Sequence, residues 1–266
     1  MASIIRSRDN PRVKHWSKLA QDTRYRKKAR RALVEGPHLV TALVDARLKP
    51  VALIVSEGYL AEIPASIKEA GMQPIVLSEA VFRAVVDVET PQGIAAEIEI
   101  PAPGIASAAS SKGSCVFLEG VQDAGNVGAI IRSAAAFGIA SVILDNACAD
   151  PWSPKVLRAG MGGHFSVSIE SAPSLTHQLE SFSGRLLCTV PRSGESLASA
   201  DLSGRLGWVF GSEGKGVSAQ ALKEADLKIT IPAAPGTESL NVAAAAAICL
   251  YEAFSRPSRR PEAKPQ

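Results

Sequence analysis

Short apolar runs alternate with helix-like stretches over the first part of the chain. The apolar runs predict strands at 32–34, 51–55, 74–77 and 94–100. The stretches between them predict helices that end near residue 46 and that cover 60–70 and 79–86. This alternation of strands and helices predicts a small, compact α/β sandwich.

The alternation stops at a Pro-, Ala- and Ser-rich stretch without hydrophobic period, 101–113, and starts again at Ser114. The second series predicts strands at 115–119, 141–145, 165–169, 185–190, 206–210 and 228–231. It predicts helices near 126–138, 154–160, 173–182, 217–224 and 240–254. This order indicates an α/β domain with a mostly parallel sheet. The last helix is apolar nearly all round, which favours burial against a sheet or a second subunit.

The pattern therefore divides the chain into two domains. We expect the first over 1–100, a linker over 101–113, the second over 114–256 and a disordered tail over 257–266.

Positive charge is concentrated at the two ends of the chain. Residues 1–31 hold eleven Lys or Arg against two acidic residues, and 256–266 hold four against one. The residues between them are net −9, although the whole chain is +3. Basic ends indicate contact with a polyanion, with a solvated basic tail as the alternative. One dense run suits contacts with phosphates and a neighbouring base or ribose. Its basic members are Arg24, Arg26, Lys27, Lys28, Arg30 and Arg31.

Residue spacing excludes several common sites. The four cysteines form no Cys-x-x-Cys pair, so we expect reduced core thiols in a cytoplasmic protein. No signal peptide is visible, and the most apolar run, 242–250, is too short to span a membrane. The glycines match neither the dinucleotide fingerprint nor the phosphate loop, and no zinc signature is present, so we expect no metal. We expect His164 to be structural and not a base.

Three Gly- or Pro-rich turns concentrate the candidate chemistry. They lie within 117–132, 208–216 and 231–242, and each follows an apolar strand and precedes a helix. Ligands of open α/β sheets bind at the carboxyl ends of strands. Three such turns in one half of the chain therefore predict one composite site.

These three stretches resemble the motifs of the SpoU (TrmH-type) branch of the SPOUT methyltransferases. Residues 119–132 resemble the first motif, 210–216 the second and 231–242 the third. The first hundred residues resemble the substrate-binding domain of these enzymes, which is similar to a small ribosomal protein; 34–36 and 90–93 are its marks. The resemblance implies a catalytic α/β domain with a deep trefoil knot, and a homodimer whose active sites draw on both subunits.

The resemblance also implies roles for the matching polar residues. Arg132 matches the catalytic arginine; because a guanidinium makes a poor base, we expect it to stabilise a developing alkoxide and to position a phosphate, while the proton leaves through water or a phosphate. Asn126 would orient Arg132 or the ribose, and Glu213 would hold Arg132 or accept a ribose hydrogen bond. Asn241 and Ser239 would lie near the cofactor and the catalytic groups.

Each of these residues also has a structural alternative. Arg132 could cap a helix or pair with an acid, Asn126 could be a turn residue, and Glu213 could be an acid at a helix start. Ser239 could be the N-cap of the last helix.

The resemblance implies that S-adenosylmethionine is bound mainly by backbone groups. By position these belong to Gly211, Ile231 and Leu240, with Gly216 and Gly236 allowing close approach. Ala243 stands where many relatives carry a hydroxyl residue, which changes the hydrogen bonds expected around the third motif.

The sequence thus predicts a metal-free, dimeric enzyme that transfers a methyl group from S-adenosylmethionine to a ribose 2′-hydroxyl in RNA. Ribosomal RNA is the favoured substrate because the first domain and its basic arm suit a large folded RNA. Transfer RNA is the first alternative. A non-catalytic RNA-binding protein on the same fold is the rival from another class.

Overall fold

The computed structural model describes residues 3–101, 113–236 and 238–256. The expected tail, 257–266, and nearly all of the expected linker lie outside these residues. The chain divides into two compact units. One consists of Met1–Ala102 with Asp150–Phe165, and the other of Pro103–Ala149 with Ser166–Gln266.

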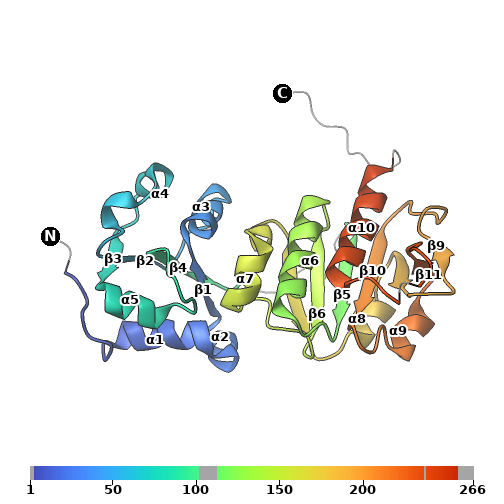
Figure 1. Cartoon of the computed structure of the whole chain (residues 1–266), viewed down its shortest axis with the longest axis horizontal. Helices are drawn as coiled ribbons and strands as arrows, with labels where there is room; N and C mark the ends of the chain where they lie inside the picture. Colours follow the sequence, from blue (N-terminus) through green and yellow to red (C-terminus); the bar gives the residue numbers. More distant parts are fainter. Residues whose placement is uncertain (1–2, 102–112, 237, 257–266) are drawn as a thin grey trace, which may run out of the picture. The chain divides into compact units, whose positions relative to one another are not determined.

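The first unit is built on a four-stranded sheet with the order β1-β4-β2-β3 (Figure 1). Its strands are β1 (Arg31–Glu35), β2 (Ala52–Ser56), β3 (Pro74–Leu77) and β4 (Ile94–Glu99). β4 pairs antiparallel with β1 and β2, while β2 and β3 are parallel. The four predicted strands and the α/β class of this unit are confirmed.

Helices precede, connect and follow these strands. They are α1 (Pro11–Gln21), α2 (Thr23–Ala29), α3 (Pro37–Asp45), η1 (Leu60–Glu62), α4 (Ala65–Glu69), α5 (Glu79–Val85), α7 (Pro154–Gly160) and η2 (Gly163–Phe165). The single helix predicted over 60–70 is wrong, because Pro64 ends the first turn and stands as the N-cap of α4. Proline has no amide hydrogen and therefore cannot continue a helix from within.

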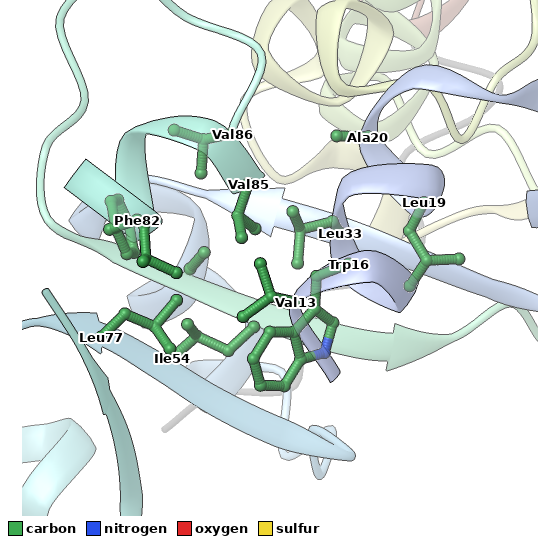
Figure 2. Close-up of a cluster of buried hydrophobic side chains, with 12 residues drawn as sticks. Val13, Trp16, Leu19, Ala20, Leu33, Ile54, Leu77, Phe82, Val85 and Val86 are labelled. Carbon is green, nitrogen blue, oxygen red and sulfur yellow. The ribbon is translucent and has the colours of Figure 1, made fainter. Parts of the chain in front are cut away.

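Trp16 anchors the core of this unit, shown in Figure 2 with Phe82, Ile54 and Leu77. Its ring is 2% exposed, and its Nε1 donates a 2.8 Å hydrogen bond to the buried carboxylate of Glu97. A buried polar group is stable only when it has a hydrogen-bond partner, so this bond fixes how α1 sits on β4.

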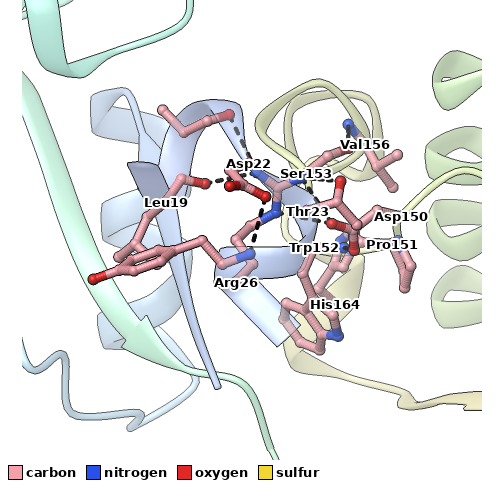
Figure 3. A network of polar contacts seen from close by, with 12 residues as sticks. Leu19, Asp22, Thr23, Arg26, Asp150, Pro151, Trp152, Ser153, Val156 and His164 are labelled. Carbon is pink, nitrogen blue, oxygen red and sulfur yellow. Dashed lines mark hydrogen bonds and ion pairs between the residues drawn. The ribbon is translucent and has the colours of Figure 1, made fainter. Parts of the chain in front are cut away.

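Arg26 is a buried cation at the edge of the same unit (Figure 3). Its Nε donates to Asp150 at 2.8 Å, and its Nη1 donates to the carbonyl oxygens of Leu19 and Ala20. Its Nη2 donates to the Thr23 hydroxyl. The guanidinium therefore ties α2 to the start of the Asp150–Phe165 segment, far along the chain.

His164 lies in that segment and is 3% exposed. Its Nε2 donates a 2.8 Å hydrogen bond to the Pro151 carbonyl, and its ring packs on Trp152. Its Nδ1 has no hydrogen-bond partner among the described residues. Burial lowers the pKa of His164 to about 4, because a protonated ring would hold an unpaired charge away from water. The prediction of a structural histidine agrees with this placement.

The second unit contains a seven-stranded sheet with the order β7-β6-β5-β10-β8-β11-β9, in which the neighbouring strands pair in parallel. Its strands are β5 (Cys115–Glu119), β6 (Ser141–Asp145), β7 (Ser168–Ala172), β8 (Arg185–Thr189), β9 (Glu195–Ser196), β10 (Leu206–Gly211) and β11 (Leu227–Thr230). The mostly parallel sheet is confirmed. The strand predicted at 165–169 starts later, because η2 occupies 163–165, and the two-residue β9 was not predicted.

Helices α6 (Ala124–Ala136), α8 (Thr176–Glu180), α9 (Ala219–Glu224) and α10 (Val242–Ser255) connect or follow these strands. α10 packs on α6 and β10, and its buried residues include Ala246, Cys249 and Leu250. The opposite face of α10 is exposed in the single chain. The predicted burial of this apolar helix is therefore confirmed for one of its two faces. The knot remains a prediction.

Three of the four cysteines are buried and none is paired, in agreement with the predicted core thiols. Burial raises the pKa of Cys188 and Cys249 to about 12, which makes these thiols unreactive. Within the described ranges, no helix combines the length and the apolar character needed to cross a membrane.

Arg26→Ala should destabilise the first unit, because it leaves the Asp150 carboxylate buried without its cation. Breaking a buried pair in this way costs about 3–5 kcal/mol. Urea unfolding followed by tryptophan fluorescence measures the change. The neighbouring, exposed Lys27→Ala is the matched control, with an expected change below about 0.5 kcal/mol. Equal stability of the two variants would contradict the structural role of Arg26.

His164 should make stability fall in acid. Its pKa is lower in the folded protein than in the unfolded chain, so its contribution is complete above pH 6.5 and is lost as the pH falls towards 4. The full difference corresponds to about 3 kcal/mol. Urea midpoints between pH 7 and 4.5 should fall less steeply for His164→Gln, which keeps a donor but does not titrate. The exposed His177→Gln should behave as the wild type; an unchanged slope for His164→Gln would refute the assignment.

Candidate active site

Parallel pairing of β5 with β10 brings the first two motifs together. Their last residues, Glu119 and Gly211, are directly opposite each other in the register. Both turns therefore leave the same edge of the sheet at neighbouring points. β6 and β7 lie on one side of this pair and β8 and β11 on the other, so the chain reverses its winding direction here. Such a switch point is where open α/β sheets bind ligands.

Three predicted site residues from the three motifs form one hydrogen-bonded cluster. Asn126 Nδ2 donates to Glu213 Oε1 at 2.6 Å. Asn241 Nδ2 donates to Asn126 Oδ1 at 3.0 Å and to Glu213 Oε1 at 3.1 Å. Side chains from the three predicted turns thus meet in the second unit, and no single motif builds this cluster.

Asn241 uses its whole side-chain amide within the protein. Its Oδ1 accepts hydrogen bonds from the backbone amides of Ala243 and Ala244, which makes Asn241 the N-cap of α10. Its nitrogen already has two acceptors. An amide offers two donors and two acceptor positions, so none remains for a ligand. The alternative that Ser239 caps this helix is wrong.

A cavity of about 520 Å³ lies beyond the carboxyl ends of β10, β8 and β11. Its size falls within the range of about 300–1,000 Å³ that is typical of small-molecule sites. Six of the predicted residues line it: Gly211, Glu213, Gly216, Ile231, Ser239 and Leu240. Gly236 has a positive φ of 88° but is not among the lining residues. The wall also includes Thr189, Val190 and Pro191, which sequence analysis missed although they lie at the end of the strand predicted at 185–190.

Gly211 is the tightest point of this wall. A Cβ atom placed there would come within 2.1 Å of the carbonyl carbon and oxygen of Gly216. Gly216 itself has a φ of +66°, and its amide donates to the Ser212 carbonyl, which closes the loop. The loop is therefore a backbone cradle that only glycine at 211 permits.

A second cavity, of about 510 Å³, lies on the other side of the same loop. Residues 212–216 line both cavities, and Asn126 lines only the second. The remaining wall includes three carboxylates that were not predicted as ligands, Glu119, Asp123 and Asp145. No group of three or more His, Cys, Asp or Glu side chains in the described part of the chain is arranged so that it could hold a metal ion.

Arg132 is not part of the cluster. It is exposed on α6 and has no hydrogen bond or ion pair with another described residue. It lies six residues after Asn126, which corresponds to a rotation of about 120° and a shift of about 9 Å along a helix. The structure therefore brings together Asn126, Glu213 and Asn241 and leaves Arg132 on another face.

Some cations of the predicted RNA-binding run have no ion pair with a described residue, whereas others are already bound within the protein. Arg24, Lys27 and Lys28 are exposed and have no ion pair with a described residue. Arg30 is exposed and donates to a backbone carbonyl, whereas Arg31 pairs with Glu99 at 2.6 Å. The prediction for Arg26 is corrected, because its guanidinium is buried and fully engaged inside the first unit.

The second unit is thus an α/β domain with a mostly parallel sheet in which two cavities meet at one polar wall. Comparison with known proteins identifies the family to which this chain belongs. The SpoU rRNA Methylase family matches residues 113–251, and the MRM3-like substrate binding domain matches residues 10–96. The chain belongs to the SpoU rRNA methylase family and is an RNA methyltransferase.

Relatives align along nearly the whole chain. The 23S rRNA (guanosine(2553)-2′-O)-methyltransferase RlmP of Bacillus subtilis is 36% identical over 250 residues, which covers 93% of this chain and 97% of that protein. The SpoU methyltransferase AviRb from Streptomyces viridochromogenes, solved with its cofactor AdoMet, gives a TM-score of 0.81 at 25% identity. That match covers 92% of this chain and 97% of AviRb. An rRNA methyltransferase from Sinorhizobium meliloti gives 0.81 at 27% identity, with coverages of 95% and 97%.

Gly211→Ala should weaken binding of S-adenosylmethionine, the ligand in the AviRb structure, because the new Cβ displaces the Gly216 backbone. We expect a loss of about tenfold or more, equal to about 1.4 kcal/mol, measured by calorimetry. Gly214→Ala is the matched control, since its Cβ would meet no atom within 4 Å. Circular dichroism verifies that both variants fold. Unchanged affinity in folded Gly211→Ala would show that the cradle does not hold this ligand.

Proposed function

We propose that the protein is an S-adenosylmethionine-dependent 2′-O-ribose methyltransferase that acts on ribosomal RNA. The observation that carries this proposal is the Asn126–Glu213–Asn241 cluster at the wall between two ligand-sized cavities. A group transfer between two substrates needs a donor site and an acceptor site that meet at the reacting groups. A protein that only binds RNA has no need of this arrangement.

The first cavity fits S-adenosylmethionine. Gly211, Gly216, Ile231 and Leu240 would hold it, largely through backbone groups, and Ser239 offers a hydroxyl at the same wall. When bound, this cofactor supplies a methyl group on a positively charged sulfur. The apolar side chains of the cavity would exclude water from that group, and the glycine cradle would fix its position.

The cluster orders the polar groups on the acceptor side. The Asn241 side chain is hydrogen-bonded to Asn126, to Glu213 and to the first turn of α10. These bonds fix the three motifs relative to one another. Asn126 retains one amide hydrogen and one acceptor position with which to orient a ribose. Preformed hydrogen-bonding groups lower the cost of reorganisation during reaction.

We propose a homodimer through α6 and α10. Ile248, Tyr251 and Phe254 are 41%, 56% and 44% exposed on one face of α10, and Phe137 at the end of α6 packs on both of the α10 aromatic rings. A contiguous exposed apolar surface favours association with another chain. We propose that Arg132, which is exposed on α6, serves the site of the partner subunit, where its charge would stabilise a developing alkoxide.

We assign RNA binding to the domain over 1–100 and catalysis to 114–256, a division that the two family matches support. Arg24, Lys27 and Lys28 offer unpaired charges to phosphates on the first unit. Ribosomal RNA is favoured over transfer RNA because RlmP and the Sinorhizobium meliloti protein are named for rRNA. We propose that the protein works in the cytoplasm, because its substrate would be ribosomal RNA and its thiols are unpaired.

The purified protein should transfer label from S-adenosylmethionine to unmodified ribosomal RNA and not to transfer RNA. The label should resist alkali, because a methylated 2′-oxygen cannot attack the neighbouring phosphate. Arg132→Ala should lower transfer about 100-fold or more while cofactor affinity stays within a few-fold. If only transfer RNA is labelled, the substrate is transfer RNA and not ribosomal RNA. If the protein binds no cofactor, the enzyme hypothesis fails and the alternative of a non-catalytic RNA-binding protein takes its place.

A further inference from the structure

The wall between the two cavities contains one side chain that can act as a base. The residues that line both cavities are 212–216, and three of them carry reactive side chains: Ser212, Glu213 and Lys215. A lysine ammonium has no lone pair, and a serine hydroxyl is only a weak base. The carboxylate of Glu213 is therefore the basic group at the position where a donor and an acceptor would meet.

One oxygen of this carboxylate is fixed and the other is available. Oε1 accepts hydrogen bonds from the side-chain amides of Asn126 and Asn241. Oε2 has no hydrogen-bond partner among the described residues, and Glu213 is exposed towards both cavities. Two donors on one oxygen hold the carboxylate in one orientation. The free oxygen is thus presented in a defined direction, and no donor from the described residues competes for it.

We propose that the second cavity receives the acceptor nucleotide and that Glu213 Oε2 accepts the proton of its 2′-hydroxyl; this rests on the proposed function. Asn126 lines the second cavity only, so a ribose there touches the cluster from the side opposite the cofactor cavity. Carboxylates serve the same purpose in protein kinases, where an aspartate accepts the proton of a substrate hydroxyl.

The step balances without another reactant. The 2′-oxygen forms a bond to the methyl carbon, and the electron pair of the broken carbon–sulfur bond stays on sulfur. The hydroxyl proton passes to Glu213 Oε2, and the neutral acid later returns it to solvent. This route replaces the loss of the proton through water or a phosphate that was expected from the sequence.

Asn241 is a positioning residue in this scheme, because its amide has no group left for substrate. It holds the Glu213 carboxylate from one side while it caps α10 on the other. Removing its donors should free the Glu213 carboxylate to rotate and should lower kcat without unfolding the protein, which separates this role from a purely structural one.

The test is a comparison of Glu213→Gln with wild type, using S-adenosylmethionine and an unmodified ribosomal RNA transcript. Glu213→Gln should lower kcat about 100-fold or more, the usual contribution of a general base. The dissociation constants for the cofactor and the transcript should stay within a few-fold. Glu195→Gln, an exposed acid on β9 outside both cavities, is the matched control and should retain wild-type kcat.

A change at Asn241 supplies a second readout. Asn241→Asp keeps the acceptor oxygen that caps α10 but removes both amide hydrogens, so the Glu213 carboxylate loses one of its two donors. The kcat should fall about tenfold or more, because a hydrogen bond to a charged group is lost, while cofactor affinity stays within a few-fold and urea unfolding shows a folded protein. Unchanged kcat in folded Asn241→Asp would overturn the role of Asn241.

Failure of the inference is distinguishable from failure of the proposed function. Alkali-resistant label from wild type with kcat of Glu213→Gln within about tenfold of it would refute the base and leave the methyltransferase intact. A parallel loss of cofactor affinity would show that Glu213 serves cofactor binding, and it would also refute the role of Glu213 as the base. Absence of alkali-resistant label from wild type in every RNA would overturn both.

Discussion

The parallel pairing of β5 with β10 is the constraint on which the site depends. It places Glu119 opposite Gly211, so the first two motifs leave one edge of the sheet side by side. The third motif follows β11, one strand beyond β8, and reaches the same edge through Asn241. Hydrogen bonds of 2.6–3.1 Å can then join side chains that are far apart in the sequence. Without this strand order the three motifs would be unrelated turns.

The local part of this structure was predictable, because strands and turns are set by neighbouring residues. Ten of the eleven described strands lie at or near predicted positions, and the exception is the short β9. The order of strands in a sheet depends on contacts between distant segments and has no local signal. The helix predicted over 60–70 failed for a local reason, since the backbone of Pro64 overrides the surrounding helical pattern.

The candidate site shows the same division. Resemblance to the family identified Asn126, Glu213 and Asn241, yet only the structure shows that the amide of Asn241 is fully engaged. Arg26 and Lys27 are adjacent in a basic run, and nothing in that run distinguishes them. Burial of Arg26 is decided by Asp150, 124 residues later. A pattern of charge therefore predicts a basic surface better than it predicts which cations form it.

Electrostatics connects the cluster with the proposed dimer. The cluster of one chain contains two neutral amides and the Glu213 carboxylate, and no cation belongs to it. An alkoxide developing beside an ionised carboxylate would be repelled, and transfer of the proton to Glu213 removes that repulsion. The remaining need is a positive charge near the 2′-oxygen. Arg132 has no ion-pair partner among the described residues and lies on a face that its own cluster does not use, so we propose that the second subunit of the dimer provides the site for its charge.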